Sequence, residues 1–196
     1  MDTQGRLQGI LIELWSASGK VVVKFETARL ILRTVTLGDV DDVARIWKLD
    51  EGPISRAEAE QQVQWMLANH AQNMPGKLRH LCLAIILKDT GEFIGWCGLD
   101  HLDRTKPDPA LFYLLKANYW GKGLATEAAR ALLHYAFGPM DLTSVHGGAA
   151  PENIASKRVM EKIGMKYLGT DDEGGYAFRI SREEYWHYPN ISGQLT

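Results

Sequence analysis

A glycine-rich turn between an apolar segment and a helix-forming segment has residue types that suit the binding of a phosphate. The apolar segment covers residues 111–116, and the turn is the Gly-Lys-Gly at residues 121–123. Because glycine lacks a Cβ atom, the backbone can bend sharply there and its N–H groups can approach a ligand closely. The first N–H groups of a following helix have no partner within the helix, and the helix dipole adds partial positive charge. Such a junction can hold a pyrophosphate without a cluster of basic side chains.

The turn alone is weakly specific, because a tight strand–helix connection can need glycine for steric reasons only. It is not a P-loop, since the sequence has no Gly-x-x-x-x-Gly-Lys-Ser/Thr. It is not the dinucleotide-binding fingerprint either, since Thr126 stands where that pattern has a third glycine. A nucleotide-like ligand would therefore be bound in another way.

A second polar constellation lies downstream, at Asn153 and Ser156. Asn153 has the residue type of a helix N-cap, and Ser156 falls in the first turn of the same helix. The apolar positions Val159, Met160 and Ile163 then form one face. A capped surface helix without any chemical role explains this spacing equally well.

The two segments together resemble the GNAT superfamily of N-acetyltransferases. The Trp-Gly-Lys-Gly-Leu-Ala-Thr-Glu-Ala of residues 120–128 is similar to its coenzyme A-binding motif, Gln/Arg-x-x-Gly-x-Gly/Ala. Trp120 departs from the general pattern and resembles the ribosomal-protein N-terminal (RimJ/RimL-like) branch. The Asn-x-x-Ser followed by Arg-Val-Met-Glu-Lys-Ile-Gly-Met resembles the corresponding helix of that branch. With Thr27-Ala-Arg-Leu-Ile-Leu-Arg and Phe178-Arg-Ile-Ser-Arg-Glu-Glu-Tyr, the resemblance covers about residues 26–186.

This resemblance implies acetyl-CoA as co-substrate and assigns the residues that would hold it. Asn153 would bond the pantetheine arm, and Ser156 would lie near the thioester sulfur and donate to it as it departs. Leu115, at the end of a strand, would pair with the same arm and supply a backbone N–H as oxyanion donor. The pyrophosphate would be held by the backbone N–H groups of Gly121, Lys122, Gly123, Leu124, Ala125 and Thr126.

The function expected from this resemblance is transfer of an acetyl group to a primary amine, on a protein N-terminus or a small molecule. A second interpretation is a binding module that keeps the acetyl-CoA site with weak catalysis, as a sensor or scaffold. A third is a nucleotide-binding domain unrelated to coenzyme A.

The general base of such a reaction is poorly determined by the sequence. Some relatives have a carboxylate near the position that Ala110 occupies here. Candidates elsewhere are His101, which we take as the first candidate, and Asp100, His146 and Glu92. A histidine titrates near neutral pH and accepts a proton directly or through water.

Composition excludes several other classes. The chain has 196 residues, 45% hydrophobic and 23% charged, which is typical of one globular domain. Its formal net charge of −2 gives no general attraction to nucleic acid. No export signal and no apolar run of about 20 residues is present, which predicts a cytoplasmic protein without a membrane span.

Cys82 and Cys97 are expected to be reduced and buried. No group of residues has the spacing of metal ligands, so no metal is expected. The protein is expected to be a monomer or a homodimer.

The elements that must position these residues form an α/β (α+β) domain. The resemblance implies the GNAT fold, a mixed, mostly antiparallel, twisted sheet flanked by helices, with splayed central strands that bind acetyl-CoA. Periodicity predicts strands at residues 29–35, 81–87, 92–99, 111–116, 142–145, 165–168 and 176–180. Helices are predicted at residues 39–49, 56–70, 124–137 and from Asn153 to Gly164.

Residues 1–25 are expected to form an extension or an extra hairpin, and residues 26–196 are expected to form the single GNAT acetyltransferase domain. Residues 49–70, with Asp50 and Glu51, are expected to set acceptor choice, beside Trp47 and Trp65.

Overall fold

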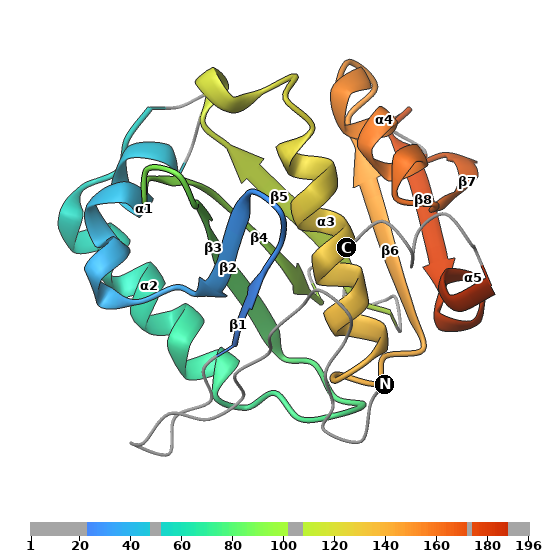
Figure 1. Ribbon diagram of the computed structural model, residues 1–196, viewed down its shortest axis with the longest axis horizontal. Helices are drawn as coiled ribbons and strands as arrows, with labels where there is room; N and C mark the ends of the chain where they lie inside the picture. The colour runs from blue at the N-terminus through green and yellow to red at the C-terminus, as the bar shows by residue number, and fades with distance from the viewer. Residues whose placement is uncertain (1–22, 48–51, 102–107, 172–173, 188–196) are drawn as a thin grey trace.

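The molecule is built on one eight-stranded sheet, in the strand order β1-β2-β3-β4-β5-β6-β8-β7 (Figure 1). The computed structural model describes residues 23–47, 52–101, 108–171 and 174–187. The strands are β1 (Lys24–Glu26), β2 (Leu30–Thr34), β3 (His80–Leu87), β4 (Phe93–Asp100), β5 (Ala110–Leu115), β6 (Ser144–Ala149), β7 (Lys166–Thr170) and β8 (Tyr176–Ser181). The α-helices are α1 (Val40–Ile46), α2 (Arg56–His70), α3 (Leu124–Phe137), α4 (Ile154–Lys162) and α5 (Arg182–His187), with short 3-10 helices η1 (Leu37–Asp39) and η2 (Ala117–Tyr119).

All neighbouring strands are antiparallel except β5 and β6, at the centre of the sheet. These two run parallel and share one recorded pairing, Ala110 with His146. His146 N donates to Pro109 O at 3.0 Å in the same place. The expected mixed, mostly antiparallel sheet is confirmed, and its ladder is weakest between the two strands that are expected to hold the cofactor.

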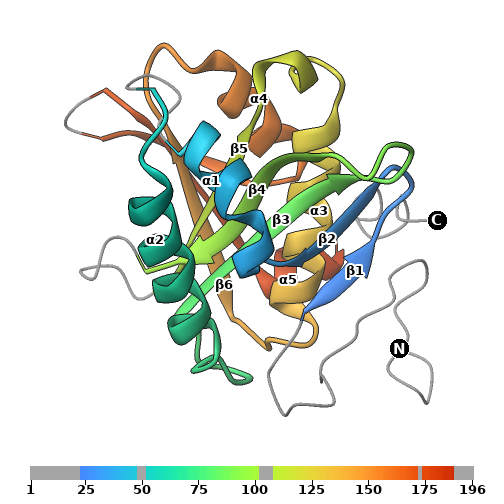
Figure 2. The ribbon, with the colours of Figure 1, turned by 90° about the vertical axis from the view of Figure 1, so that its left-hand side faces the viewer.

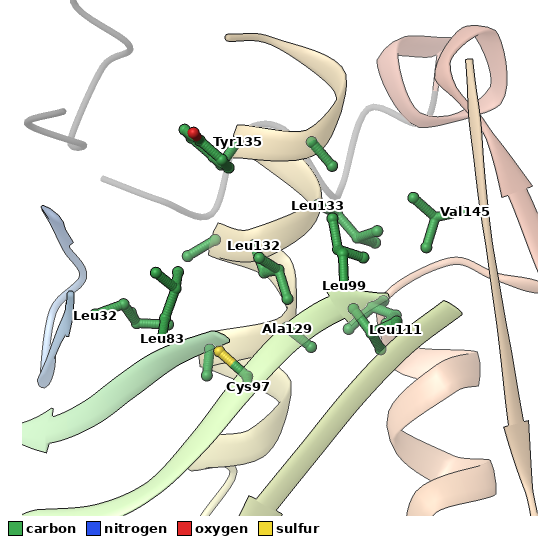
Figure 3. Packing of buried hydrophobic residues seen from close by; sticks show 14 of the residues in the cluster. Leu32, Leu83, Cys97, Leu99, Leu111, Ala129, Leu132, Leu133, Tyr135 and Val145 are labelled. Carbon is green, nitrogen blue, oxygen red and sulfur yellow. The ribbon is translucent and has the colours of Figure 1, made fainter. Parts of the chain in front are cut away.

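Helices cover both faces of the sheet. In Figure 2, α1 and α2 lie in front of the sheet and α3 lies behind it. The side chains of β3 alternate between these two sides: Leu83 belongs to the core beneath α3, and Ala84 to the core beneath α1 and α2. Figure 3 shows α3 side chains, among them Leu132 and Leu133, packed toward Leu99 of β4. Burial on both faces explains why β3 is apolar throughout rather than alternating.

The two cysteines follow the same alternation. Cys97 belongs to the α3 side of the core and Cys82 to the α1/α2 side, and both are free and buried. The predicted burial of both thiols is confirmed, and the two lie on opposite faces of the sheet. Their reduced state stays a prediction.

Turn and cap signals in the sequence place several elements correctly. Ser55 and Glu58 form the expected capping box at the start of α2. The β3–β4 hairpin closes at Gly91, whose N–H donates to Leu87 O at 2.8 Å. Helix α3 has the predicted bounds, and Asn153 caps α4.

Other predicted bounds were wrong. Strand β6 begins at Ser144 and extends to Ala149, whereas a strand at residues 142–145 was expected. Gly147 and Gly148 weaken the strand pattern, but a Cβ on Gly147 would lie 2.9 Å from Met160 Sδ, so the close approach of α4 requires glycine there. Helix α5 was not predicted.

The beginning of the described chain joins the main sheet. Strand β1 pairs with β2, and Val23 and Phe25 are buried in the α3 side of the core. Residues 1–22 of the expected extension or extra hairpin lie outside the described residues, as do Asp50 and Glu51. None of the helices in the described ranges is long and apolar enough to cross a membrane.

Candidate active site

The glycine-rich turn enters α3 with both glycines in the left-handed region. Gly121 has φ +71° and Gly123, the N-cap of α3, has φ +76°. A Cβ on Gly121 would meet nothing within 4 Å, so the space beside the turn is open. No side chain caps the helix at Gly123, which leaves the first N–H groups of α3 for a ligand.

Two residues from the turn between β1 and β2 brace the glycine-rich turn. Glu127, in the first turn of α3, accepts hydrogen bonds from Thr27 Oγ1 at 2.5 Å and from Arg29 Nε at 2.7 Å. Arg29 Nη1 also donates to Lys122 O at 3.0 Å. Burial alone would raise the pKa of Glu127, but the hydrogen bonds from Thr27 and Arg29 hold it below its usual value. The Lys122 carbonyl oxygen is thereby held by the Arg29 guanidinium.

The edge of β5 that faces β6 pairs with it at one place among the described residues, Ala110 with His146. Lys116 N donates to Ile94 O at 2.9 Å, so Lys116 hydrogen-bonds toward β4. Successive residues of an antiparallel strand point their N–H groups alternately to the two neighbouring strands. Leu115 and Tyr113 therefore direct their N–H groups away from β4 and toward β6. The Leu115 carbonyl on that edge accepts a hydrogen bond from Trp120 Nε1 at 2.7 Å. The N–H of Leu115 is therefore available to a ligand, whereas its carbonyl already accepts the hydrogen bond from Trp120.

Helix α4 lies across the gap from β5. Asn153 Oδ1 accepts from Ser156 N at 3.0 Å, so the asparagine serves as the helix cap and keeps its amide NH₂ for another partner. Tyr113 OH donates to Ser156 O at 3.4 Å. The fold thus brings the backbone of Ser156 within reach of the Tyr113 side chain of β5.

The candidate bases are distributed differently. Asp100, the last residue of β4, is the Cα partner of Ala110, and His101 follows it. His101 makes no hydrogen bond or ion pair with the described part of the chain, and nothing in the structure joins it to Ser156. His146 lies on β6 opposite Ala110. Glu92 bonds Tyr119 OH at 2.5 Å and pairs with Lys116, a structural role at the other end of β4.

Sequence reasoning did not single out Tyr113, Arg29 or Glu127. Tyr113 is two residues before Leu115, so strand alternation alone would have placed it on the same edge. Arg29 and Glu127 are 98 residues apart, and neither has a local pattern that predicts their contact.

A family model described as "Acetyltransferase (GNAT) domain" matches residues 29–166, more than half of the chain. The chain belongs to the GNAT acetyltransferase family. An uncharacterized N-acetyltransferase p20 of Bacillus licheniformis is 28% identical over 150 residues, which cover 73% of this chain and 82% of the relative.

Solved structures of the family share the fold. A ribosomal-protein-S5-alanine acetyltransferase of Vibrio fischeri has a TM-score of 0.70 at 17% identity, covering 83% of this chain and 98% of that one. The RimJ protein of Mycobacterium smegmatis, solved in complex with CoA-disulfide, has a TM-score of 0.69 at 20% identity, covering 85% and 87%. The N-acetyltransferase assignment and the mixed sheet expected from the sequence are confirmed.

The residues present suit acetyl-CoA, the co-substrate that the family uses. The end of strand β5, two left-handed glycines, the first of them beside open space, and a helix start without a side-chain cap follow one another along the chain. In the described ranges no group of three or more His, Cys, Asp and Glu residues is arranged to hold a metal ion.

Proposed function

We propose that this N-acetyltransferase transfers the acetyl group of acetyl-CoA to a primary amine, on a protein N-terminus or on a small molecule. The observation that carries the proposal is the junction of β5, the turn and α3. There the backbone N–H groups from Gly121 to Thr126 are available to a pyrophosphate, through the open space beside Gly121.

Each remaining residue has a role that its position supports. Leu115 supplies its backbone N–H toward an oxyanion, a contribution worth about 10²–10³ in rate elsewhere. The Asn153 amide contacts the pantetheine arm. Ser156 donates its hydroxyl to the departing sulfur. Acetyl-CoA, when bound, supplies the activated thioester that the amine attacks.

A catalytically weak acetyl-CoA sensor is the second candidate, favoured by one observation. Position 110 carries alanine, so β5 itself offers no carboxylate that could accept a proton from the amine. Such a module would bind acetyl-CoA and release thiol no faster with amines than without them.

The test is a thiol-release assay of the full chain with acetyl-CoA and a panel of amines. The panel contains alanyl and seryl tripeptides, spermidine, a free amino acid and an aminoglycoside, with each acceptor also supplied in N-acetylated form as its control. The alanyl peptide is included because of the acceptor named for the Vibrio fischeri enzyme. Amine-dependent thiol release supports the enzyme; binding of acetyl-CoA without it supports the sensor.

A further inference from the structure

A buried histidine–carboxylate pair lies at the end of the sheet on the side covered by α1 and α2. His80 is the first residue of β3 and Asp100 the last of β4, and the two are Cα partners. His80 Nδ1 lies 3.0 Å from Asp100 Oδ2, in a contact oblique to the ring N–H. His80 is 5% exposed.

The other ring nitrogen of His80 has no visible function in the fold. Nε2 is buried and has no hydrogen-bond partner within the described residues. A buried polar atom without a partner is costly, and native proteins contain few of them. The carboxylate beside Nδ1 favours the tautomer with its proton on Nδ1, which leaves the lone pair of Nε2 available as an acceptor.

Two aromatic rings border the imidazole. Trp65 of α2 meets it edge-on with ring centroids 4.7 Å apart, and Phe112 of β5 stacks at 6.1 Å. Phe112 fits there only because residue 98 is glycine, where a Cβ would lie 2.3 Å from Phe112 Cζ. Trp65 is half exposed, at 49%. Aromatic faces attract ammonium groups, so this surround suits a cationic amine rather than an anion.

The His80 backbone is held in place independently of the ring. Asn73 Nδ2 donates to His80 O at 2.7 Å, and Asn73 Oδ1 accepts from His80 N at 3.2 Å. A fixed backbone and a ring clamped between two aromatic side chains restrict the imidazole to a narrow range of positions.

The pair stands at the level of the sheet where the cofactor gap begins. Asp100 is the register partner of Ala110, and Ala110 makes the recorded pairing with His146 of β6. Paired residues project to the same face of a sheet. The Asp100 carboxylate therefore lies on the same face as the side chain of Ala110. Phe112, whose ring stacks on His80, is three residues before Leu115, the proposed oxyanion donor, or about 10 Å at the rise of a strand.

We propose that the His80–Asp100 pair is the general base that deprotonates the acceptor amine, so that the carboxylate absent from position 110 is replaced from the neighbouring strands. The inference rests on the proposed acetyl transfer. The ammonium of the acceptor gives one proton to Nε2 through bridging water molecules, and Asp100 stabilises the imidazolium. The neutral nitrogen then bonds the thioester carbonyl carbon, the C–S bond breaks with its electron pair on sulfur, and the sulfur takes the second amine proton. The imidazolium returns its proton to solvent.

The charges around His80 agree with this role. Asp100 is the charged group in contact with the ring. Arg79 directly precedes His80 in the chain, but its guanidinium bonds to α2, where Nε donates to Asn69 Oδ1 at 3.1 Å. The faces presented by α2 and β5 at this point, Trp65 and Phe112, are uncharged. Burial lowers the pKa of His80 more than Asp100 raises it, so the ring is neutral at pH 7, the form that a base requires.

The experiment measures kcat against pH for His80→Gln and Asp100→Asn, at saturating acetyl-CoA and with the amine of the panel that releases thiol fastest. His187→Gln on the exposed α5 and Asp89→Asn in the β3–β4 turn are the matched controls, and His101→Gln tests the competing base. Melting temperature and CoA affinity are measured for each variant. Glutamine keeps the size of the side chain but cannot take up a proton.

We expect His80→Gln to lower kcat at pH 7 about 10²-fold or more, to remove the acid limb of the profile and to recover partly at high pH. Asp100→Asn should lower kcat and shift the acid limb to lower pH, because the imidazolium loses its carboxylate. This shift would decide the matter if His80→Gln fails to fold. An acid limb that both variants leave unchanged, or that His101→Gln alone removes, overturns the inference while the enzyme remains. No thiol release by the wild type with any amine instead defeats the proposed function itself.

Discussion

Glu127 and Arg29 form the ion pair that joins the β1–β2 turn to the first turn of α3, with Arg29 Nη2 2.7 Å from Glu127 Oε2. The same guanidinium holds the carbonyl of Lys122. The pair therefore fixes the orientation of the peptide group between the two glycines of the phosphate-binding turn, although neither side chain needs to touch the ligand.

Replacing Glu127 with Gln should loosen this turn without emptying the space that the side chain fills. We expect the KM for acetyl-CoA to rise about tenfold with little change in kcat, since a hydrogen bond to a charged group is worth about 1.5–3 kcal/mol. Glu60→Gln on the exposed face of α2 is the control. Initial rates at varied acetyl-CoA measure both constants, and an unchanged KM in Glu127→Gln would contradict the bracing role.

Ser156→Ala tests the group proposed to donate to the departing sulfur. The cap of α4 uses the backbone N–H of Ser156, so the substitution leaves the hydrogen bond that this N–H donates to Asn153 Oδ1 in place. A charge-assisted hydrogen bond lost in the transition state should lower kcat about 10- to 100-fold, with CoA affinity unchanged. If kcat stays at the wild-type value, the hydroxyl has no part in the reaction.

His134 predicts a loss of stability in acid. It lies beneath α5 with Nδ1 3.1 Å from Tyr185 OH, and burial lowers its pKa to about 4. Because the folded-state pKa is below the unfolded value of about 6.5, the neutral ring contributes full stability above pH 6.5 and this contribution is lost as the pH falls toward 4. The free energy of unfolding should fall by roughly 3 kcal/mol over that range from this residue.

The measurement is urea unfolding at several pH values for the wild type and His134→Gln. The variant should be less stable at neutral pH but show a flatter pH dependence between about pH 4 and pH 6.5. Equal slopes for the two proteins would show that His134 is not the titrating group.

The elements that carry local signals were predictable from the sequence, and those set by distant contacts were not. Ser55, Gly91 and Gly123 each mark an element end through their own conformational preferences, and the structure agrees at each. Strand β6 was misplaced because Gly147 meets the tertiary demand of α4 at the cost of its own strand pattern. The His80–Asp100 pair was not predicted because it depends on the register of β3 against β4, which periodicity does not give.

The domain bounds, the cytoplasmic location and the oligomeric state remain predictions, as do the roles of the site residues.

The two buried thiols provide a simple test of the packing on the two faces of the sheet. Burial raises the pKa of both Cys82 and Cys97 above the ordinary thiol value. We expect neither to react with a thiol reagent in the native protein and both to react in denaturant, with no change in melting temperature on adding a reductant. Rapid labelling of either cysteine in the native state would contradict the burial.

The central claim, that the turn before α3 binds the diphosphate of coenzyme A, is tested most directly by calorimetric titration of CoA into Gly123→Ala and Gly76→Ala. Both glycines have φ +76°, so alanine should strain each by a similar amount, about 1–2 kcal/mol, but Gly76 lies in the turn before β3, outside the proposed site. We predict that Gly123→Ala weakens CoA binding at least about tenfold, because relief of the strain turns the first N–H groups of α3 away from the ligand. Gly76→Ala should bind CoA as the wild type does. Equal CoA affinity in the two variants, or no binding by the wild type, would contradict the account.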